Sequence, residues 1–249
     1  MADKIIDVYM VANGLYHDID YARQELLKLL AEHENVRVKV ASNYSDIEGI
    51  AASDFLITYC CHLIPSEEEQ VALRDYVSSG KRWIALHGTN AILDFVDEGV
   101  ACPERAPIFM ETLGSQFMAH PPIAPFTVRI TDPEHELVKG INEFETDDEL
   151  YICKMHGEHH ALLHTNFTGS CDGFIEKDWP DDEPRVMYYL HPVGEGEVIY
   201  NCLGHCRGHY DMRPVTDYYP VIERGSWDKP EYYELLRRSI KYCLDRVAA

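Results

Sequence analysis

Strand-like and helix-like segments alternate in the N-terminal third of the chain, and this alternation limits the possible folds more than any other feature. Runs rich in β-branched and aromatic residues are typical of buried strands, and four occur here: Ile5 to Ala12, Val36 to Ala41, Asp54 to Cys60 and Trp83 to Leu86. Apolar residues at helical spacing lie between them, from Asp18 or Asp20 through His33 and from Pro65 to Gly80. Strands separated by helices form parallel sheets covered on both faces, so the pattern predicts an α/β sandwich with a mainly parallel sheet.

The rest of the chain has a weaker pattern. The stretch from Asp94 to His120 contains Pro103, Pro107 and Gly114, which favours short helices and loop. Further elements are expected as strands at Thr127 to Ile130 and Glu149 to Lys154, a hairpin of Val186 to Leu190 with Glu197 to Cys202, and a closing helix from Pro230 to Val247. Neither a repeat nor a linker interrupts the pattern, so we expect a single domain over residues 1–249.

The chain is strongly acidic, with 43 acidic against 22 basic residues and a formal net charge of −21. This field would repel a phosphate backbone or an anionic membrane surface, so neither nucleic acid nor a membrane is expected as a partner. No apolar run approaches the ~20 residues of a membrane span, and the N-terminus lacks a signal-peptide pattern. The eight cysteines are scattered without a CxxC pair, which indicates free, reduced thiols in a cytoplasmic protein.

Polar residues follow several of the expected strands at the point where each strand ends. In open α/β sheets, ligands bind beyond the carboxyl ends of the strands, so these residues are candidates for the functional site. The candidates are Asn13 and His17 after the first strand, Cys60, Cys61 and His62 after the third, His87, Thr89 and Asn90 after the fourth, and His205, Arg207 and His209 after the hairpin.

His87 is the most informative of these residues. The run Trp83-Ile-Ala-Leu-His-Gly-Thr89 reads as a buried strand that turns sharply at Gly88. Related α/β enzymes use such a strand-to-helix elbow to present a nucleophile. Histidine can serve there as a base or as a metal ligand, and a side chain hydrogen-bonded under a loop is the structural alternative.

An ordered set of short motifs now makes the chain resemble a known family. The motifs are Gly14 with His17, Asp54-Phe-Leu-Ile57, Leu73-Arg-Asp-Tyr-Val-Ser-Ser-Gly80, Ile84-Ala-Leu-His-Gly88, Gly114 with Phe117, His120-Pro121, Asp132-Pro-Glu-His135, Gly140, Asp148-Glu-Leu-Tyr151, His191-Pro192, Gly194-Glu-Gly196, Val198-Ile-Tyr200 and Leu203-Gly-His205. Together they resemble the ThuA-like (trehalose utilisation) family, which is related to class I glutamine amidotransferases.

The resemblance implies a flavodoxin-like three-layer α/β/α sandwich and a role in sugar metabolism. The amidotransferase elbow carries cysteine where this chain has His87, so the resemblance does not extend to glutaminase chemistry. Cys60 and Cys61 end a different strand and do not replace that cysteine.

Four histidines and an acidic pair are the candidates for metal binding and catalysis. His17, His87, His120 and His205 come from separate segments, and their convergence would suit one divalent metal, with zinc the first candidate. Asp148 and Glu149 precede an apolar segment, where one carboxylate could act as a base or a ligand beside His87. The alternative is a metal-free polar pocket in which histidine performs acid–base catalysis.

Substrate contacts are expected from polar and aromatic residues near the same edge. Arg, His and aromatic residues in one loop suit a polar substrate with an apolar face, such as a sugar. The candidates are Asn13, Thr89, Asn90, Tyr151, Arg207 and His209, and Trp179 and Trp227 could stack on a sugar ring. The tract His156, His159 and His160 and the turn residue His135 read more readily as structural.

Three functions are compatible with these residues. The first is an enzyme that hydrolyses, eliminates from or isomerises a sugar or sugar derivative, with a metal-activated water or a His/Glu pair. The second is a non-catalytic small-molecule-binding protein on an amidotransferase-like fold, and the third is a thiol-dependent enzyme using Cys60 or Cys61. Neither GxGxxG nor GxxxxGK[ST] occurs, so no nucleotide cofactor is expected. The expected partner is a sugar-like small molecule, and assembly into a homo-oligomer is left open.

Overall fold

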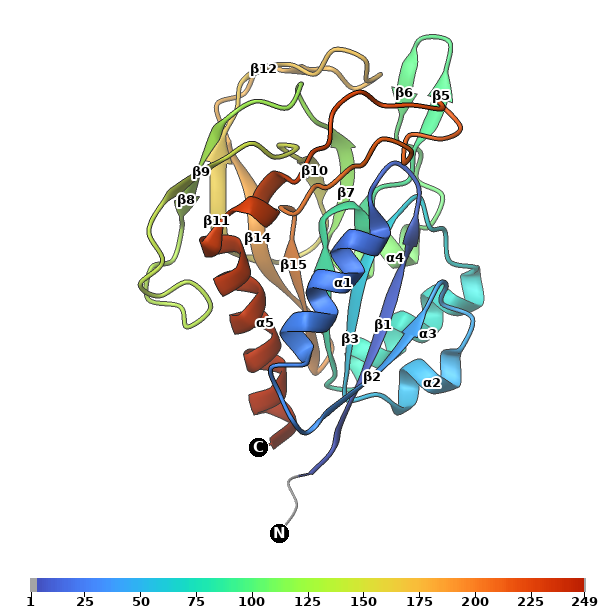
Figure 1. Cartoon of the computed structure of the whole chain (residues 1–249), viewed down its shortest axis with the longest axis vertical. Coiled ribbons are helices and arrows are strands. Elements are labelled where there is room, and N and C mark those ends of the chain that lie inside the picture. The colour runs from blue at the N-terminus through green and yellow to red at the C-terminus, as the bar shows by residue number, and fades with distance from the viewer. Residues whose placement is uncertain (1–3, 249) are drawn as a thin grey trace.

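A nine-stranded sheet runs through the molecule, which we describe from a computed structural model covering residues 4–248 (Figure 1). The strand order is β2-β1-β3-β4-β15-β14-β11-β8-β9. These strands are β1 (Ile6–Gly14), β2 (Val36–Ala41), β3 (Phe55–Cys61), β4 (Arg82–Leu86), β8 (Phe126–Ile130), β9 (Phe144–Thr146), β11 (His160–Asn166), β14 (Pro184–Val193) and β15 (Gly196–Asn201). Three two-stranded sheets add β5 (Asp94–Val96) with β6 (Gly99–Ala101), β7 (Ser115–Ala119) with β10 (Ile152–Met155), and β12 (Gly169–Ser170) with β13 (Asp178–Trp179).

The large sheet is parallel in one half and antiparallel in the other. β2, β1, β3, β4 and β15 pair in parallel, as the sequence predicted for the first four strands. β14 then pairs antiparallel with β15 as the predicted hairpin, and β11, β8 and β9 continue the antiparallel half. The predicted α/β architecture is therefore confirmed, with an antiparallel extension that makes the sheet mixed.

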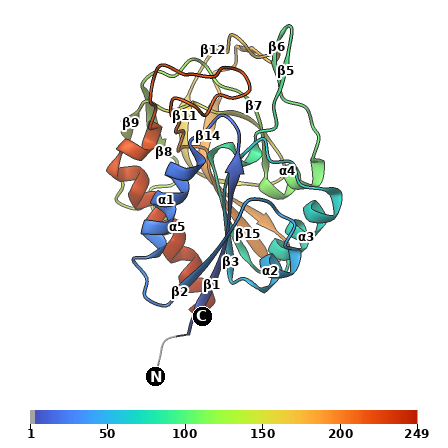
Figure 2. The ribbon, with the colours of Figure 1, turned by 45° about the vertical axis from the view of Figure 1, so that its right-hand side comes forward.

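Helices cover both faces of the parallel half, which gives the three-layer arrangement seen in Figure 2. α1 (Ile19–Leu30) and α5 (Pro230–Ala248) lie on one face, and α2 (Ile47–Ala52), α3 (Glu67–Ser78) and α4 (Pro107–Leu113) lie on the other. Two short 3₁₀ helices, η1 (His87–Asn90) and η2 (Gly225–Asp228), complete the elements. None of the helices in residues 4–248 is both long and apolar enough to cross a membrane.

Local sequence signals explain why the first helices begin where they do. Asp18 caps α1 by accepting a hydrogen bond from the backbone of Tyr21. Ser66 and Glu69 form a capping box at the start of α3. The central strand β3 is buried along its whole length, as its continuous apolar run indicates. All eight cysteines are free, which confirms the predicted absence of disulfides.

The region from residue 94 to residue 155 differs most from the expectation. One short helix is present as expected, α4, but the β5–β6 hairpin and the strand β7 take the place of further helix and loop. The predicted strand at Glu149 to Lys154 begins only at Ile152, as β10, so Glu149 and Tyr151 lie in the segment that leads into it. This segment leaves the ladder because Asp148 binds backbone groups of the loop after β15. These pieces fold over the edge where β1, β3, β4 and β15 end (Figure 1).

Candidate functional site

Three buried histidines and one glutamate meet beyond the ends of the central strands. His17 follows β1, His87 follows β4, His205 follows β15, and Glu149 precedes β10. Each offers one ligand atom, and these four atoms all lie within 4.8 Å of one another. The convergence that the sequence predicted for these side chains is therefore present.

The chain places His87 through a sharp turn at the end of β4. His87 has a φ of +43°, a left-handed conformation that is rare for a residue other than glycine. The following residue must be glycine, because a β-carbon on Gly88 would lie 2.7 Å from the carbonyl oxygen of Cys60. The strand-to-helix elbow predicted from the sequence is thus formed, and it aims a fully buried imidazole at the site.

Backbone carbonyls fix the tautomers of His17 and His87. Nδ1 of His17 lies 3.2 Å from the carbonyl oxygen of Leu15, and Nδ1 of His87 lies 2.8 Å from that of Cys202. A carbonyl oxygen can only accept, so each Nδ1 carries the proton and each neutral ring presents an unprotonated Nε2. These two Nε2 atoms lie 3.0 Å apart, so two lone pairs face each other in the absence of a shared proton or cation.

His205 is oriented in the opposite sense. Its Nε2 donates to Glu223 over 2.8 Å, which turns Nδ1 toward the same centre. This Nδ1 lies 3.3 Å from Oε1 of Glu149, is buried, and satisfies no hydrogen bond among the described residues. A proton or a cation between this nitrogen and the carboxylate of Glu149 would satisfy both atoms.

A divalent cation fits this arrangement of donors. Three imidazole nitrogens and one carboxylate oxygen converge, which is a ligand set that zinc uses in proteins. Each imidazole is also held from behind by a carbonyl or a carboxylate, the outer contacts that usually orient metal-binding histidines. The residues therefore match a metal site in both their inner and their outer contacts.

Burial and charge act in opposite directions on the acids and bases of the site. Burial lowers the pKa of His17 to about 3, so its ring is neutral near pH 7. Burial also acts to lower the pKa of His205, but the charges of Glu149 and Glu223 outweigh it and raise that pKa to about 9. Burial acts to raise the pKa of Glu149, yet His120 and His205 hold it well below its usual range. In the metal-free protein the proton therefore rests on His205.

His120 lies beside the cluster rather than within it. Its Nε2 is 3.6 Å from Oε1 of Glu149, and its Nδ1 lies 2.8 Å from the carbonyl oxygen of Pro121. Its side chain is 23% exposed, whereas His87 and His205 are fully buried. The four atoms within 4.8 Å of one another do not include an atom of His120, which the sequence grouped with the metal ligands.

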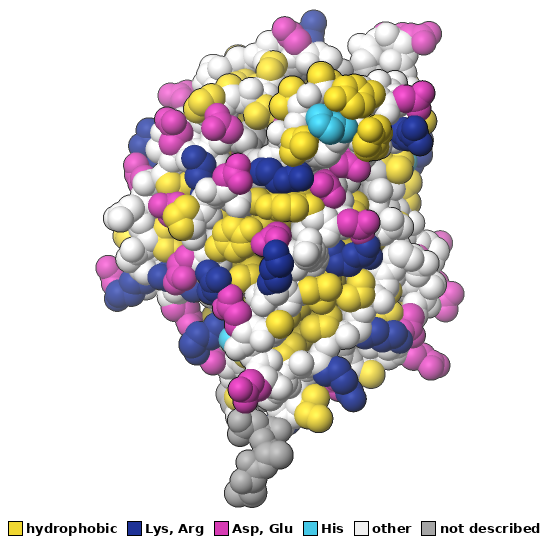
Figure 3. Space-filling view, viewed as in Figure 1, with side chains coloured by type: hydrophobic (Ala, Val, Ile, Leu, Met, Phe, Trp, Pro, Cys, Tyr) yellow, Lys and Arg dark blue, Asp and Glu magenta, His cyan; other side chains and the backbone are white. Residues whose placement is uncertain are grey.

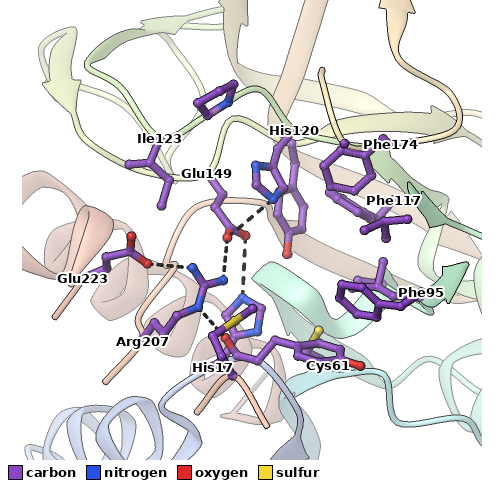
Figure 4. Close-up of a pocket in the computed structure, with 18 of the residues that line it drawn as sticks. His17, Cys61, Phe95, Phe117, His120, Ile123, Glu149, Phe174, Arg207 and Glu223 are labelled. Carbon is purple, nitrogen blue, oxygen red and sulfur yellow. Dashed lines mark hydrogen bonds and ion pairs between the residues drawn. The ribbon is translucent and has the colours of Figure 1, made fainter. Parts of the chain in front are cut away.

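Arg207 connects the two carboxylates of the site. Its guanidinium donates to Glu149 over 3.0 Å and to Glu223 over 2.8 Å, and its Nε donates to the carbonyl of Tyr16 over 2.9 Å. Figure 4 shows this guanidinium between the two carboxylates. These hydrogen bonds hold Glu149 in place, and the positive charge of Arg207 neutralises part of the negative charge of Glu149.

Asp148 holds the loop that carries His205. Its carboxylate accepts hydrogen bonds from the backbone nitrogens of Gly204, His205 and Ser226 over 2.8–3.0 Å. The sequence placed Asp148 with Glu149 as a catalytic candidate. Asp148 is instead turned away from the pocket and acts on the site through the position of His205.

Two members of the cluster, His17 and Glu149, line a pocket of about 510 Å³, whereas the fully buried His87 and His205 do not line it. His17, His120, Glu149, Arg207 and Glu223 contribute polar atoms to its surface. Figure 4 shows Arg207 and Glu223 at one side, the phenylalanine rings at the other, and His120 beside those rings. The remaining lining residues are Tyr16, Cys61, Ala91, Leu93, Phe95, Val100, Phe117, Pro122, Ile123, Tyr151, Asp172, Gly173, Phe174, Met212 and Tyr219.

Of the six substrate-binding candidates from the sequence, Tyr151 and Arg207 line this pocket. Asn13 donates to the carbonyl of Ser42, Thr89 to that of Leu86, and His209 contacts that of Tyr219. Asn90 is buried and donates to Ser115. These four side chains lie at the predicted edge, but they turn toward neighbouring backbone or into the core rather than into the pocket.

The tryptophans and the thiols do not take the roles considered for them. Trp227 is buried and donates to the carbonyl of Gly204, and neither it nor Trp179 lines the pocket. Burial raises the pKa of Cys60 to about 11 and that of Cys61 still further. Both thiols therefore remain protonated near pH 7, which disfavours a cysteine nucleophile.

Glu223 is the site residue that sequence reasoning missed. It lies in the irregular segment between β15 and α5, where a backbone bridge with Arg207 brings it to the site. No periodic pattern marks that segment. The one available signal is an acidic residue in a loop that already supplies Arg207 and His205.

Comparison with known proteins gives a family match and several structural neighbours. Residues 7–221 match the model of a family described as ThuA, trehalose utilisation. No curated protein matches the sequence.

Solved structures show the same fold at low sequence identity. A ThuA-like protein from Bacteroides uniformis is 14% identical with a TM-score of 0.69, covering 98% of this chain and 93% of that chain. A ThuA-like protein from Parabacteroides merdae is 15% identical with a TM-score of 0.60, covering 96% and 90%. A GMP synthase protein from Thermoplasma acidophilum is 10% identical with a TM-score of 0.50, covering 96% of both chains. These likenesses establish the fold, which is of the glutamine amidotransferase-like kind.

Proposed function

The chain belongs to the ThuA, or trehalose utilisation, family, and on that premise we propose that its His–Glu cluster binds a divalent metal and is the active site of an enzyme acting on a sugar derivative. The family supports a sugar-related role, and the site supports the chemistry.

One observation carries the proposal: the lone pairs of three buried histidines converge with the carboxylate of Glu149. Neutral imidazoles would repel one another at the 3.0 Å that separates the Nε2 atoms of His17 and His87. A cation would satisfy these lone pairs and, by displacing the proton of His205, would bind its Nδ1 as well. Nitrogen and oxygen ligands in this number favour zinc over magnesium or calcium, which prefer oxygen.

The residues that face the pocket supply the remaining chemistry. A bound divalent ion would polarise a substrate oxygen and lower the pKa of water. His120 lines the pocket with its Nε2 3.6 Å from Glu149, so we assign it proton transfer rather than metal binding. Burial raises the pKa of Tyr151 well above its usual value, and its hydroxyl forms no hydrogen bond within residues 4–248, so it can donate to the substrate. Hydrolysis, elimination and isomerisation are all compatible with these groups.

Metal analysis combined with turnover tests the proposal. We expect the purified protein to bind close to one zinc ion per chain and to lose it to a chelator. A panel of disaccharides and glycosides, trehalose included, is then assayed with the metal-free and the reloaded protein. Failure to bind any divalent ion at micromolar free concentration would refute the metal site.

A non-catalytic binding protein is the second candidate. The observation that favours it is His87 at the elbow where related amidotransferases carry a nucleophile. A protein that binds one ion per chain and binds sugars, but turns none of them over, would support this candidate.

A further inference from the structure

We infer that the substrate of this pocket is an uncharged sugar derivative that carries an apolar, planar substituent. The inference rests on the proposed function, because it assumes that the polar end of the substrate meets the His–Glu cluster. It adds the nature of the other end of the substrate and the absence of a phosphate or carboxylate group.

Three phenylalanines form what we call the aromatic wall: Phe95, Phe117 and Phe174. They come from the β5–β6 hairpin, from β7 and from the loop between β12 and β13, and all three line the pocket. The ring of Phe174 lies 5.7 Å from that of Phe117 and 5.0 Å from that of His120. Figure 4 shows the wall opposite Arg207 and Glu223. The polar cluster therefore occupies one side of the pocket only.

The aromatic wall is open to solvent in part. Phe95 is 47% exposed and contacts Tyr16 at a ring distance of 5.3 Å. Further apolar side chains are exposed nearby in the chain, among them Val96 and Ile175. Figure 3 shows further hydrophobic side chains gathered at the upper end of the molecule, over the loop between β15 and α5. Burial of exposed aromatic surface is favourable, so an apolar ring of the substrate would bind against this wall.

The pocket is large enough for a substrate that extends beyond the polar cluster. About 510 Å³ lies within the usual range for pockets that enclose drug-sized ligands. Hydroxyl groups of a sugar need hydrogen-bond partners, and these are concentrated around His17, Glu149 and Arg207. The space beside the aromatic wall offers few such partners, so an apolar group fits it better than a second sugar ring.

The side-chain charges of the pocket disfavour an anionic group at any position away from the metal. Arg207 is the one cationic side chain among the described lining residues, and both of its terminal nitrogens already bind Glu149 and Glu223. Asp172 adds a third carboxylate at the surface of the pocket. The chain as a whole carries a net charge of −21. Away from the metal, a phosphate would therefore meet repulsion without a free basic partner.

Hydroxamates test the inference without knowledge of the sugar, because they share a metal-binding head and differ in the attached group. We measure the affinity of the zinc-loaded protein for acetohydroxamate, benzohydroxamate and 4-carboxybenzohydroxamate by calorimetry. The phenyl compound should bind at least tenfold more tightly than the methyl compound. The added carboxylate should weaken binding at least tenfold relative to benzohydroxamate.

Variants of the aromatic wall locate the effect. Phe174→Ala should remove most of the advantage of benzohydroxamate while leaving acetohydroxamate unchanged. The neighbouring Ile175 is 45% exposed and does not line the pocket, so Ile175→Ala is the matched control. Phe95→Ala, at a more exposed position, repeats the test if Phe174→Ala perturbs folding.

The outcomes separate the two proposals. Equal affinity for the phenyl and methyl compounds, or an advantage that survives both phenylalanine variants, would overturn the aromatic preference. Undiminished binding of the carboxylate compound would overturn the exclusion of anions. Absence of zinc binding would instead refute the proposed function and would be seen before any hydroxamate is added.

Discussion

His87 shows how backbone strain and a single hydrogen bond together orient a candidate metal ligand. Its positive φ turns the imidazole away from the direction that β4 would give it, and the carbonyl of Cys202 fixes the proton on Nδ1. The left-handed conformation is unfavourable by about 1 kcal/mol or more for such a residue. Its persistence in a fully buried position indicates that the surrounding structure imposes it.

Replacing His87 by alanine should remove the metal and leave the fold intact. The change deletes one of three nitrogen ligands, so we expect zinc affinity to fall by more than ~100-fold, beyond the effect of losing an outer contact. Zinc content and circular dichroism measure the two parts. His135→Ala is the control, since His135 lies outside the cluster and should leave zinc binding unchanged. Wild-type affinity in the His87 variant would remove this residue from the site.

Metal binding should release a proton from His205. The raised pKa of about 9 means that this ring is protonated at pH 7.5 in the metal-free protein, and the ion must displace that proton. Affinity should therefore increase about tenfold per pH unit between pH 7 and pH 8. Calorimetry in buffers of different ionisation enthalpy counts the protons, with about one expected.

The same proton has the opposite effect on the metal-free fold. A pKa raised from 6.5 to about 9 stabilises the folded state fully below pH 6.5, and this stability is lost as the pH rises through 9. Glu223→Gln removes one of the two charges responsible and should shift both effects toward lower pH. Zinc binding without proton release would show that His205 is neutral or is not a ligand.

At the scale of elements, the loop after β15 depends on Asp148. One buried carboxylate accepts three backbone hydrogen bonds from Gly204, His205 and Ser226, and so joins the segment before β10 to the two ends of this loop. The loop contributes His205, Arg207 and Glu223 to the site, and its geometry therefore follows from a residue outside the pocket.

Asp148→Asn should destabilise the protein and weaken zinc binding together. The amide keeps the shape but loses one acceptor oxygen and the charge, so we expect the free energy of unfolding to fall by about 3 kcal/mol. Chemical denaturation and zinc titration provide the measurements. Asp147 is adjacent and exposed, so Asp147→Asn should change neither quantity. Equal behaviour of the two variants would contradict the role of Asp148.

Local sequence patterns are sufficient for the strands that are buried on both sides. Phe55–Cys61 is apolar throughout, so its interpretation as a central strand does not depend on the rest of the chain. The start of β10 is different, because Leu150 and Tyr151 continue its apolar pattern although the backbone there has left the sheet. Only the distant partners of Asp148 reveal this, and they are 56 or more residues away.

The sequence predicted which residues meet at the candidate site, because the sheet topology determines this, but it did not predict where each side chain points. The carboxyl ends of parallel strands meet at one edge, which brings His17, His87 and His205 together. The direction of each side chain is set by contacts that are not local in sequence. Asn13 turns to the carbonyl of Ser42, and Glu223 reaches the site through its pairing with Arg207. No spacing rule in one sequence contains that information.

At the scale of the whole molecule, one sheet and one buried cluster connect the N-terminal and C-terminal parts of the chain. β15 pairs with β4 on one side and β14 on the other, so strands from distant parts of the sequence are neighbours. The prediction of a single domain over residues 1–249 implies that these parts unfold together.

Calorimetry should show one unfolding transition, and zinc should raise the melting temperature of that whole transition. An ion at 100 times its dissociation constant adds about 2.7 kcal/mol to the stability of the folded state. For a chain of this size that raises the melting temperature by about 5–10 °C. The His87→Ala variant provides the control, because its transition should not respond to zinc. Two resolved transitions, or a shift confined to part of the heat absorption, would contradict a single cooperative unit.

The position of β15 also has a consequence for biosynthesis. This strand is the last to enter the sheet, and it inserts between β4 and β14 rather than adding to an edge. On the ribosome, β4 is synthesised early and waits without one neighbour until residues beyond 200 have emerged. His205 follows directly, so the candidate ligands that follow β1 and β4 gain their third histidine only at that late stage. The proposed metal site is therefore complete only once the last strand of the sheet has been made.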